Sequence, residues 1–351
     1  MKIDLNELRK RADFINEQKH DKLDLILWNY NQHCQFEGHW DEFTTLARGL
    51  ITDLEGNVVA LPFRKFFNVG QTNETQLEAL LQLGEPTVYE KLDGSLGILY
   101  FNSGIPHIST RGSFNSDQAK WATEWVQERN PQFSRDYTYL FEIIYPNNRI
   151  VVDYGTRSEL VLLAVIHTDS GQEINYLTEA ERLGLSAAKQ HSFKVAELLE
   201  KAKTLSPTEE GYVLKFSDGL RVKIKGEEYV RLHRLITGFS NKSIWELLAN
   251  HQPFDELLEK VPDEFYEYVR QTKYDLEQSF LNIVSELHAE WEASKMQLPT
   301  NPTRKDYAEV FKKCEHTSLL FAYLDGKPHD QMIWKMVKPK FAKPFRQDID
   351  L

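Results

Sequence analysis

The pattern of hydrophobic and polar residues changes character about two-thirds of the way along the chain. From about residue 24 to 225, short β-rich runs alternate with turn residues. The clearest runs are 97–101, 137–144, 149–154 and 160–167, with helical stretches around 116–129 and 178–203. Beyond about residue 235, apolar residues recur at three-, four- and seven-residue steps, the spacing of one face of an amphipathic helix. The pattern predicts an α+β chain, with a sheet-rich domain over 1–235 and a helical domain over 236–351.

The clearest local prediction is a hairpin near the end of the sheet-rich part. Two alternating runs, 212–216 and 220–225, flank Asp218-Gly219, and Asp-Gly between such runs is a strong hairpin signal. On the second run Arg221, Lys223 and Lys225 share one face, about 7 Å apart. Such a row of cations binds phosphate if it faces a cleft, and is a solvated edge strand if it does not.

Composition narrows the class of protein. The 351 residues, 41% hydrophobic and 27% charged, are enough for a large catalytic domain and a smaller one. The two cysteines, Cys34 and Cys314, lie far apart and outside any metal-binding spacing, so neither a disulfide framework nor a zinc site is expected. No apolar run is long enough for a membrane helix, and the N-terminus lacks the apolar core of a signal peptide. We therefore expect a cytoplasmic protein without a membrane partner.

The net charge of −11 argues against a protein that coats nucleic acid non-specifically. Net charge averages over the whole molecule, however, and local clusters decide what a cleft attracts. The predicted hairpin carries such a local cluster, Arg221, Lys223 and Lys225. A basic active-site groove is therefore compatible with the acidic composition.

The sharpest chemical feature is the segment 90–95, Glu-Lys-Leu-Asp-Gly-Ser, which connects two predicted strands. Lys91 at a strand end can be held rigidly, and glycine lets a backbone approach a ligand closely. A hairpin turn beside a surface lysine explains the segment equally well. Two carboxylates add weight to the functional interpretation. Glu142 lies between apolar neighbours on a predicted strand, where burial is costly without a partner, although that face could be solvated. Glu210 lies at the mouth of the hairpin.

The ordered set Lys-x-Asp-Gly, Phe-Glu, Glu-Gly and Lys-x-Lys resembles the covalent nucleotidyltransferases, which comprise ATP-dependent ligases and mRNA capping enzymes. Within that group the chain is most similar to the RNA ligase 1 family of phage-type tRNA-repair ligases. The matching segments are 47–49, 65–68, 90–96, 141–142, 148–151, 210–213, 223–225 and 229–230 with 232–233. The resemblance implies an adenylyltransferase domain of antiparallel sheets with flanking helices, then an all-helical C-terminal domain linked to RNA or tRNA specificity.

The resemblance also implies a three-step mechanism. Lys91 attacks the α-phosphate of ATP, AMP passes to an RNA 5′-phosphate, and an RNA 3′-hydroxyl displaces AMP. In this scheme Lys223 and Lys225 hold the α-phosphate, and Asp93 acts at the sealing step. The other implied ATP-binding residues are Arg48, Lys65, Phe67, Glu90, Gly94, Arg111, Glu142 for the ribose and Glu210, which also positions Mg²⁺ or Mn²⁺.

The chain departs from related families in two ways. The first favours the RNA ligase branch, and the second changes the geometry of one expected contact. Ser95-Leu96-Gly97 stands where DNA ligases and capping enzymes usually place an arginine, and no segment resembles their terminal OB-fold domain. Arg111 stands where the RNA ligase family commonly has lysine, so a planar fork replaces a point charge.

The first step needs a neutral amine. An ordinary lysine has a pKa of about 10.4, so about one in 2,500 is neutral at pH 7, a handicap of about 4.6 kcal/mol. We therefore expect lysyl-adenylate formation to require a divalent metal and to rise between about pH 6 and 9.

The expected partner is RNA with 3′-hydroxyl and 5′-phosphate ends, with cleaved tRNA as one candidate and a separate end-healing kinase/phosphatase as another protein in the pathway. Two alternatives remain open from the sequence. One is another covalent nucleotidyltransferase, either a DNA ligase or a capping guanylyltransferase. The other is an inactive RNA-binding homologue.

Overall fold

The computed structural model describes residues 1–206, 208–230, 240–254, 257 and 266–339. The chain forms two compact units, Met1–Ile236 and Thr237–Leu351, each described here by itself. The boundary predicted after residue 235 and the motif extension at 232–233 lie outside the described residues.

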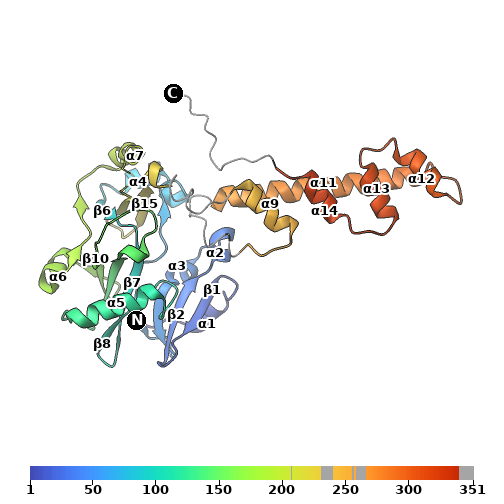
Figure 1. Cartoon of the computed structure of the whole chain (residues 1–351). Helices are drawn as coiled ribbons and strands as arrows, with labels where there is room; N and C mark the ends of the chain where they lie inside the picture. Colours follow the sequence, from blue (N-terminus) through green and yellow to red (C-terminus); the bar gives the residue numbers. More distant parts are fainter. Residues whose placement is uncertain (207, 231–239, 255–256, 258–265, 340–351) are drawn as a thin grey trace. The chain divides into compact units, whose positions relative to one another are not determined.

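The first unit contains three sheets (Figure 1). The first sheet has the order β1-β2-β3-β4 and is antiparallel throughout. Its strands are β1 (Ile15–Lys19), β2 (Leu25–Tyr30), β3 (Arg48–Asp53) and β4 (Val58–Ala60), and its helices are α1 (Leu5–Arg9), α2 (Gln32–Glu37) and α3 (Glu42–Leu46). Buried Leu50 and Ile51 of β3 share one hydrophobic core with Ile98 and Leu140 of the second sheet, so the two sheets pack together.

The second sheet has the order β11-β10-β9-β7-β8, with β12 pairing in parallel beside β10. Its strands are β7 (Ser95–Asn102), β8 (Ile105–Thr110), β9 (Tyr137–Ile144), β10 (Glu159–His167), β11 (Glu173–Ile174) and β12 (Ser186–Ala187). Two helices, α5 (Asp117–Arg129) and α6 (Tyr176–Leu183), pack on this sheet. The α5 residues Ala119, Ala122 and Val126 are buried at helical spacing, which explains why this stretch is helical.

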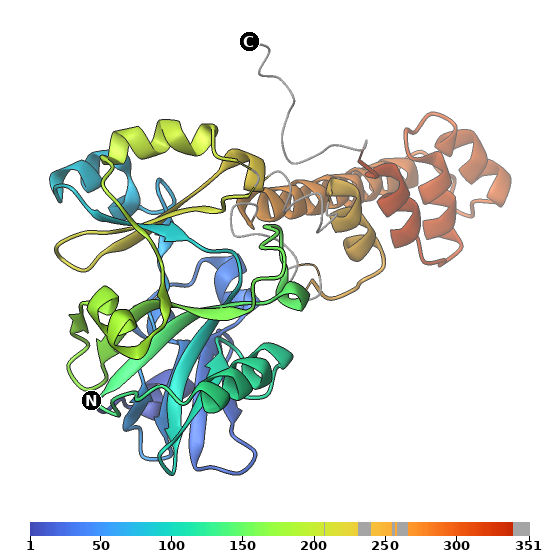
Figure 2. The ribbon, with the colours of Figure 1, turned by 60° about the vertical axis from the view of Figure 1, so that its left-hand side comes forward.

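The third sheet has the order β13-β6-β14-β15-β5 and contains the predicted hairpin. Its strands are β13 (Gln190–His191), β6 (Thr87–Lys91), β14 (Gly211–Lys215), β15 (Arg221–Lys225) and β5 (Phe67–Asn68). One face packs under α4 (Leu77–Gln82) and α7 (Val195–Lys203) through a core that includes Leu80, Leu198 and Val222 (Figure 2). Because Val222 and Ile224 point into that core, alternation directs Lys223 and Lys225 to the opposite face.

Two local predictions were wrong, each for a physical reason. The run 149–154 is not a strand, because the N–H groups of Val151 and Val152 bind the Asp93 carboxylate instead of a neighbouring strand. The stretch 178–203 is not one helix, because the left-handed Gly184 ends α6 and two short strands precede α7.

The second unit is helical over the residues that the structure describes there. Its helices are α9 (Asn241–Ala249), α11 (Tyr266–Lys295), α12 (Arg304–Phe311), α13 (Thr317–Leu324) and α14 (Asp330–Met336). Helices α11 to α14 pack through a core that includes Leu287, Phe311, Leu320 and Ile333, and α9 packs against α11. The predicted α+β class, with antiparallel sheets followed by helices, is therefore confirmed. No helix in the described part of the chain has the length and apolar character needed to cross a bilayer.

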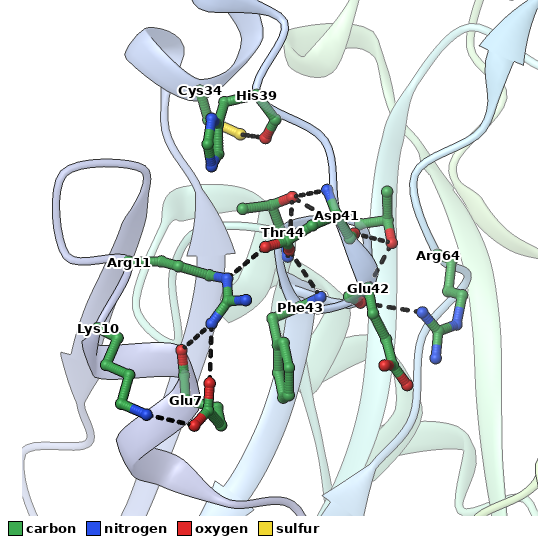
Figure 3. A network of polar contacts seen from close by, with 11 residues as sticks. Glu7, Lys10, Arg11, Cys34, His39, Asp41, Glu42, Phe43, Thr44 and Arg64 are labelled. Atoms are coloured by element: carbon green, nitrogen blue, oxygen red, sulfur yellow. Dashed lines mark hydrogen bonds and ion pairs between the residues drawn. The ribbon is translucent and has the colours of Figure 1, made fainter.

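A polar network near the N-terminus fixes the entry to β3 (Figure 3). Asp41 caps α3 by accepting hydrogen bonds from the N–H groups of Phe43 and Thr44, and it also pairs with Arg11. The Thr45 carbonyl, in the last turn of α3, accepts the N–H of Lys65 at 2.7 Å. The cap therefore supports the backbone that presents two of the predicted phosphate-binding cations, Arg48 and Lys65.

We expect Asp41→Ala to lower the free energy of unfolding by about 1–2 kcal/mol, because the first turn of α3 loses its acceptor. Urea denaturation compared with Glu42→Gln, which changes a neighbouring exposed carboxylate, would measure the difference. Equal stability of the two variants would contradict the proposed importance of this cap.

Candidate active site

Lys91, Glu210 and Lys225 meet across three neighbouring strands. Lys91 ends β6 and lies opposite Gly211 of β14, and Gly211 lies opposite Lys225 of β15. Glu210 directly precedes Gly211. Its Oε2 accepts a hydrogen bond from Lys91 Nζ at 2.6 Å, and its Oε1 lies 3.6 Å from Lys225 Nζ. The register of the third sheet therefore brings a carboxylate between two ammonium groups that are far apart in the sequence.

Burial at this point is graded in a way that suits a nucleophile. The side chain of Glu210 is 4% exposed and that of Lys225 is 10% exposed, whereas Lys91 keeps 22% of its side-chain surface accessible. These charged groups are thus largely removed from water. Electrostatic interactions between them are stronger in the protein interior than they would be in water. Lys91 retains an open side toward which a substrate can approach.

The predicted row of three cations on β15 is divided in the structure. Lys223 is buried on the same face of the strand as Lys225. Arg221 instead pairs with Glu173 at 2.6 Å, and Lys215 binds the same carboxylate at 2.8 Å. Arg221 therefore helps to clamp β15 to β11 of the second sheet, and two cations of the row remain near Lys91.

Asp93 is a buried hydrogen-bond hub. Its Oδ2 accepts the N–H groups of Val151 and Val152 at 2.8 and 2.7 Å, and its Oδ1 accepts the Tyr229 hydroxyl at 2.8 Å. The N–H of Asp93 itself donates to the hydroxyl of Tyr154 at 2.8 Å. The carboxylate therefore ties the loop after Lys91 to two distant segments of the chain. Tyr154 had no predicted role, and Tyr229 was only part of a matching segment.

Gly94 and Glu142 lie in close contact beside this hub. The Gly94 N–H donates to Glu142 Oε1 at 2.8 Å, and a Cβ on Gly94 would lie only 2.5 Å from the Ile143 carbonyl oxygen. Burial raises the pKa of Glu142 to about 8; the Lys91 ammonium opposes this rise, and the Glu210 and Asp93 carboxylates add to it. We expected that Glu142 would need partners if it were buried, and the structure gives it the Gly94 N–H as a donor and the Lys91 ammonium as a nearby opposite charge.

Aromatic rings surround a second group of predicted residues. The buried Lys65 ammonium lies 5.4–5.6 Å from the ring centres of Tyr30, Trp40 and Phe67. Arg111 stacks over the Tyr30 ring at 5.0 Å and donates to its hydroxyl at 2.9 Å. Sequence reasoning missed Tyr30 and Trp40, because no local motif marks them.

Strand pairing connects this aromatic group to the cations on β15. Phe67 lies on β5, opposite Val222 and next to Lys223 in the parallel register. Arg48, at the start of β3, lies over the Phe66 ring at 5.2 Å.

The side chain of Glu90, a predicted site residue, lies away from the Lys91 amine. Its carboxylate accepts the N–H of Lys189 at 2.8 Å, and the backbones of the two residues are also bonded. Strand alternation places the Glu90 side chain on the opposite face of β6 from Lys91.

A sequence model of the RNA ligase family matches residues 46–229, just over half of the chain, including β6 and β15, which carry Lys91 and Lys225, and Glu210 with β14, which directly follows it. The chain belongs to the RNA ligase 1 family. Membership confirms the expectation of an ATP-dependent RNA ligase enzyme, whereas the roles of individual site residues stay predictions.

Several known proteins are similar to this RNA ligase. An RNA ligase of Rhodothermus phage RM378 is 25% identical, over 86% of this chain and 85% of that protein. A Thermovibrio ammonificans protein, provisionally assigned as an RNA ligase, is 27% identical over 76% of this chain and 72% of its own length. An archaeal ATP-dependent RNA ligase structure aligns over 93% of this chain and 96% of that chain at 12% identity, with a TM-score of 0.47.

The hydrogen bonds of Asp93 predict that it positions the loop of this RNA ligase rather than supplying a charge. In Asp93→Asn the amide oxygen can still accept both N–H groups while the amide nitrogen donates to the Tyr229 hydroxyl. Asp93→Ala leaves those donors without an acceptor, at about 1–3 kcal/mol each. We expect single-turnover sealing to stay within about tenfold of the parent in Asp93→Asn and to fall more than about a hundredfold in Asp93→Ala. Equal losses in the two variants would show that the charge itself is needed.

The raised pKa of Glu142 predicts a pH-dependent stability. A carboxyl that binds its proton more tightly when folded contributes stability that is present below about pH 4.5 and is lost as the pH rises through about 8. Glu142→Gln removes this titration. We expect the free energy of unfolding of Glu142→Gln, minus that of the parent, to increase between about pH 5 and 8 and to stay constant above about pH 8. Urea denaturation at each pH measures this difference. The same exchange at exposed Glu128 is the control, and a pH-independent difference for Glu142→Gln would refute the assignment.

Proposed function

We propose that this RNA ligase joins RNA 3′-hydroxyl and 5′-phosphate ends through a covalent AMP intermediate on Lys91. The observation that carries the proposal is the contact of Lys91 with Glu210, next to Lys225 and on the cationic face of β15. This arrangement gives a partly accessible amine beside positive charge suited to a triphosphate.

In the first step, Lys91 Nζ attacks the α-phosphorus of ATP. A bond forms between nitrogen and phosphorus, pyrophosphate leaves, and the amine loses a proton. Before this attack the Lys91 ammonium must give up a first proton to water, because an ammonium has no lone pair, and its ion pair with Glu210 must open for that proton to leave. Lys223 and Lys225 then stabilise the charge on the α-phosphate.

Glu210 fits the role of a ligand for Mg²⁺ or Mn²⁺. Within the residues that the structure describes, no three Asp, Glu, His or Cys side chains are grouped to hold a metal ion. Mg²⁺ commonly uses one or two carboxylates together with substrate phosphates and water. When bound, the cation would neutralise phosphate charge and draw the Glu210 carboxylate away from the Lys91 ammonium.

In the later steps, AMP passes to the RNA 5′-phosphate and the 3′-hydroxyl oxygen displaces AMP. We assign Lys65, Arg111 and Arg48 to the outer phosphates of ATP or the RNA 5′-phosphate. Tyr30 supports this grouping, because it contacts both Lys65 and Arg111. Phe67 packs beneath the nucleotide, Glu142 and Gly94 contact its ribose side, and Glu90 acts through the β6 backbone.

The physiological substrate that we propose is broken RNA, with cleaved tRNA as the leading candidate. The helical unit would provide RNA or tRNA specificity, and the enzyme would act in the cytoplasm. A relative from Autographa californica nuclear polyhedrosis virus, provisionally named as a bifunctional polynucleotide kinase/RNA ligase, is 27% identical over 69% of this chain and 40% of its own length. Its name joins a polynucleotide kinase to an RNA ligase in one protein, which is compatible with our proposal that an end-healing kinase/phosphatase acts alongside this chain.

The decisive test combines adduct formation with ligation. Incubation with ATP and Mg²⁺ should give an AMP adduct detectable by mass spectrometry, which Lys91→Ala abolishes and Lys189→Ala, a change at an exposed lysine, retains. Adduct formation should fall more than about a hundredfold when divalent metal is removed, and should rise between about pH 6 and 9. A 5′-phosphorylated RNA strand should be sealed in preference to its DNA counterpart. An adduct with GTP alone, or none with either nucleotide, would reject the proposed function.

A further inference from the structure

A cavity of about 170 Å³ lies beside the Asp93 hub. Its lining includes Asp93, Tyr145, Asn148, Arg149, Asp153 and Tyr154. Neither Lys91, Glu210 nor the two β15 lysines line this cavity. It is therefore adjacent to the loop that carries the nucleophile but separate from the cations assigned to the nucleotide.

The size and lining of the cavity suit one planar ring. An engineered cavity of about 150 Å³ is large enough to admit benzene, so a space of about 170 Å³ can take a single nucleobase ring but not a whole nucleotide. The lining is not purely apolar, since Arg149 and Asp153 provide charged groups at the same wall. Asn148 is held in place, because its amide nitrogen donates to the Ile143 carbonyl and its oxygen accepts the Ser95 hydroxyl.

We propose that this cavity receives the terminal base of the RNA strand that carries the 3′-hydroxyl, and that Arg149 contacts a phosphate of the same strand. The inference rests on the proposed function. The final step requires the 3′-hydroxyl to reach the phosphate that bears AMP, and therefore to lie close to the Lys91 loop. Asp93 belongs both to that loop and to the cavity wall. A base held here leaves the cationic face of β15 for the phosphates.

The ion pair between Arg149 and Asp153 allows the proposed contact of Arg149 with an RNA phosphate to be tested by mutation. The two charged groups lie 2.8 Å apart and both side chains are more than half exposed. An exposed pair of this kind contributes little to stability, so either partner can be changed without unfolding the protein. Asp153 competes with an RNA phosphate for the Arg149 guanidinium. The two substitutions should therefore have opposite effects on binding of the acceptor strand.

The experiment uses the full chain and a chemically pre-adenylated RNA donor, so that only the sealing step is measured. We expect Arg149→Gln to raise the acceptor KM at least about fivefold and to reduce the slope of log affinity against log salt by about one. Asp153→Asn should lower the acceptor KM. Adduct formation from ATP should be unchanged in both variants. The matched control is Lys203→Gln, at an exposed lysine paired with Glu200 at the same distance of 2.8 Å.

An acceptor strand that ends in an abasic nucleotide tests the base-binding part of the proposal. The parent enzyme should bind it with a higher KM than the intact strand, and an equal KM would overturn the placement of the base. The proposal would be overturned if Arg149→Gln had the same acceptor KM as Lys203→Gln, or if Arg149→Gln raised the KM for ATP instead of the acceptor KM. Either result would leave ligation by the parent enzyme, and so the proposed function, intact. Failure of the parent to form an adduct or to seal RNA would instead reject the proposed function itself.

Discussion

Glu210 places a buried negative charge between two lysine ammonium groups, and the function that we propose for this RNA ligase depends on that constraint. Two ammonium groups brought together on one sheet face would repel each other, whereas a carboxylate between them compensates both charges. The same ion pair occupies the Lys91 nitrogen, so the carboxylate that stabilises this arrangement also restrains the proposed nucleophile. Binding of a metal and a triphosphate offers a physical way to release that restraint when substrate is present.

Hydrogen bonds from uncharged donors to the Asp93 carboxylate, rather than an ion pair, hold the loop that follows Lys91. The Asp93 carboxylate accepts hydrogen bonds from the N–H groups of Val151 and Val152 and from the Tyr229 hydroxyl. All three donors lie far from the loop in the sequence. Buried polar groups that are fully satisfied specify one arrangement, because every alternative leaves a donor or acceptor unpaired. The site thus combines a rigid loop with an ion pair that can exchange.

The distribution of charge explains how a chain with a net charge of −11 can serve a polyanionic substrate. The predicted phosphate-binding cations gather at two places, the face of β15 and the aromatic surroundings of Lys65. Around Lys65 the rings favour a cation without neutralising it. Net charge averages over the whole chain, so these local clusters of cations are compatible with an overall acidic protein.

The sequence by itself determined the α+β class, the hairpin at β14 and β15, and the family, because these depend on local periodicity and on short ordered motifs. It also predicted Lys91, Glu210 and Lys225 as residues of one site, and the structure brings these three side chains together. Only the tertiary structure decided that Glu210 lies between the two lysines, that Arg221 turns to Glu173, and that Tyr30 and Trp40 join the site. Those outcomes depend on which strands pair and in what register, and strand pairing between distant segments leaves no signal in local periodicity. The segment 149–154 shows the same limit, since its β-like pattern gave way to hydrogen bonds with a carboxylate far away in the sequence.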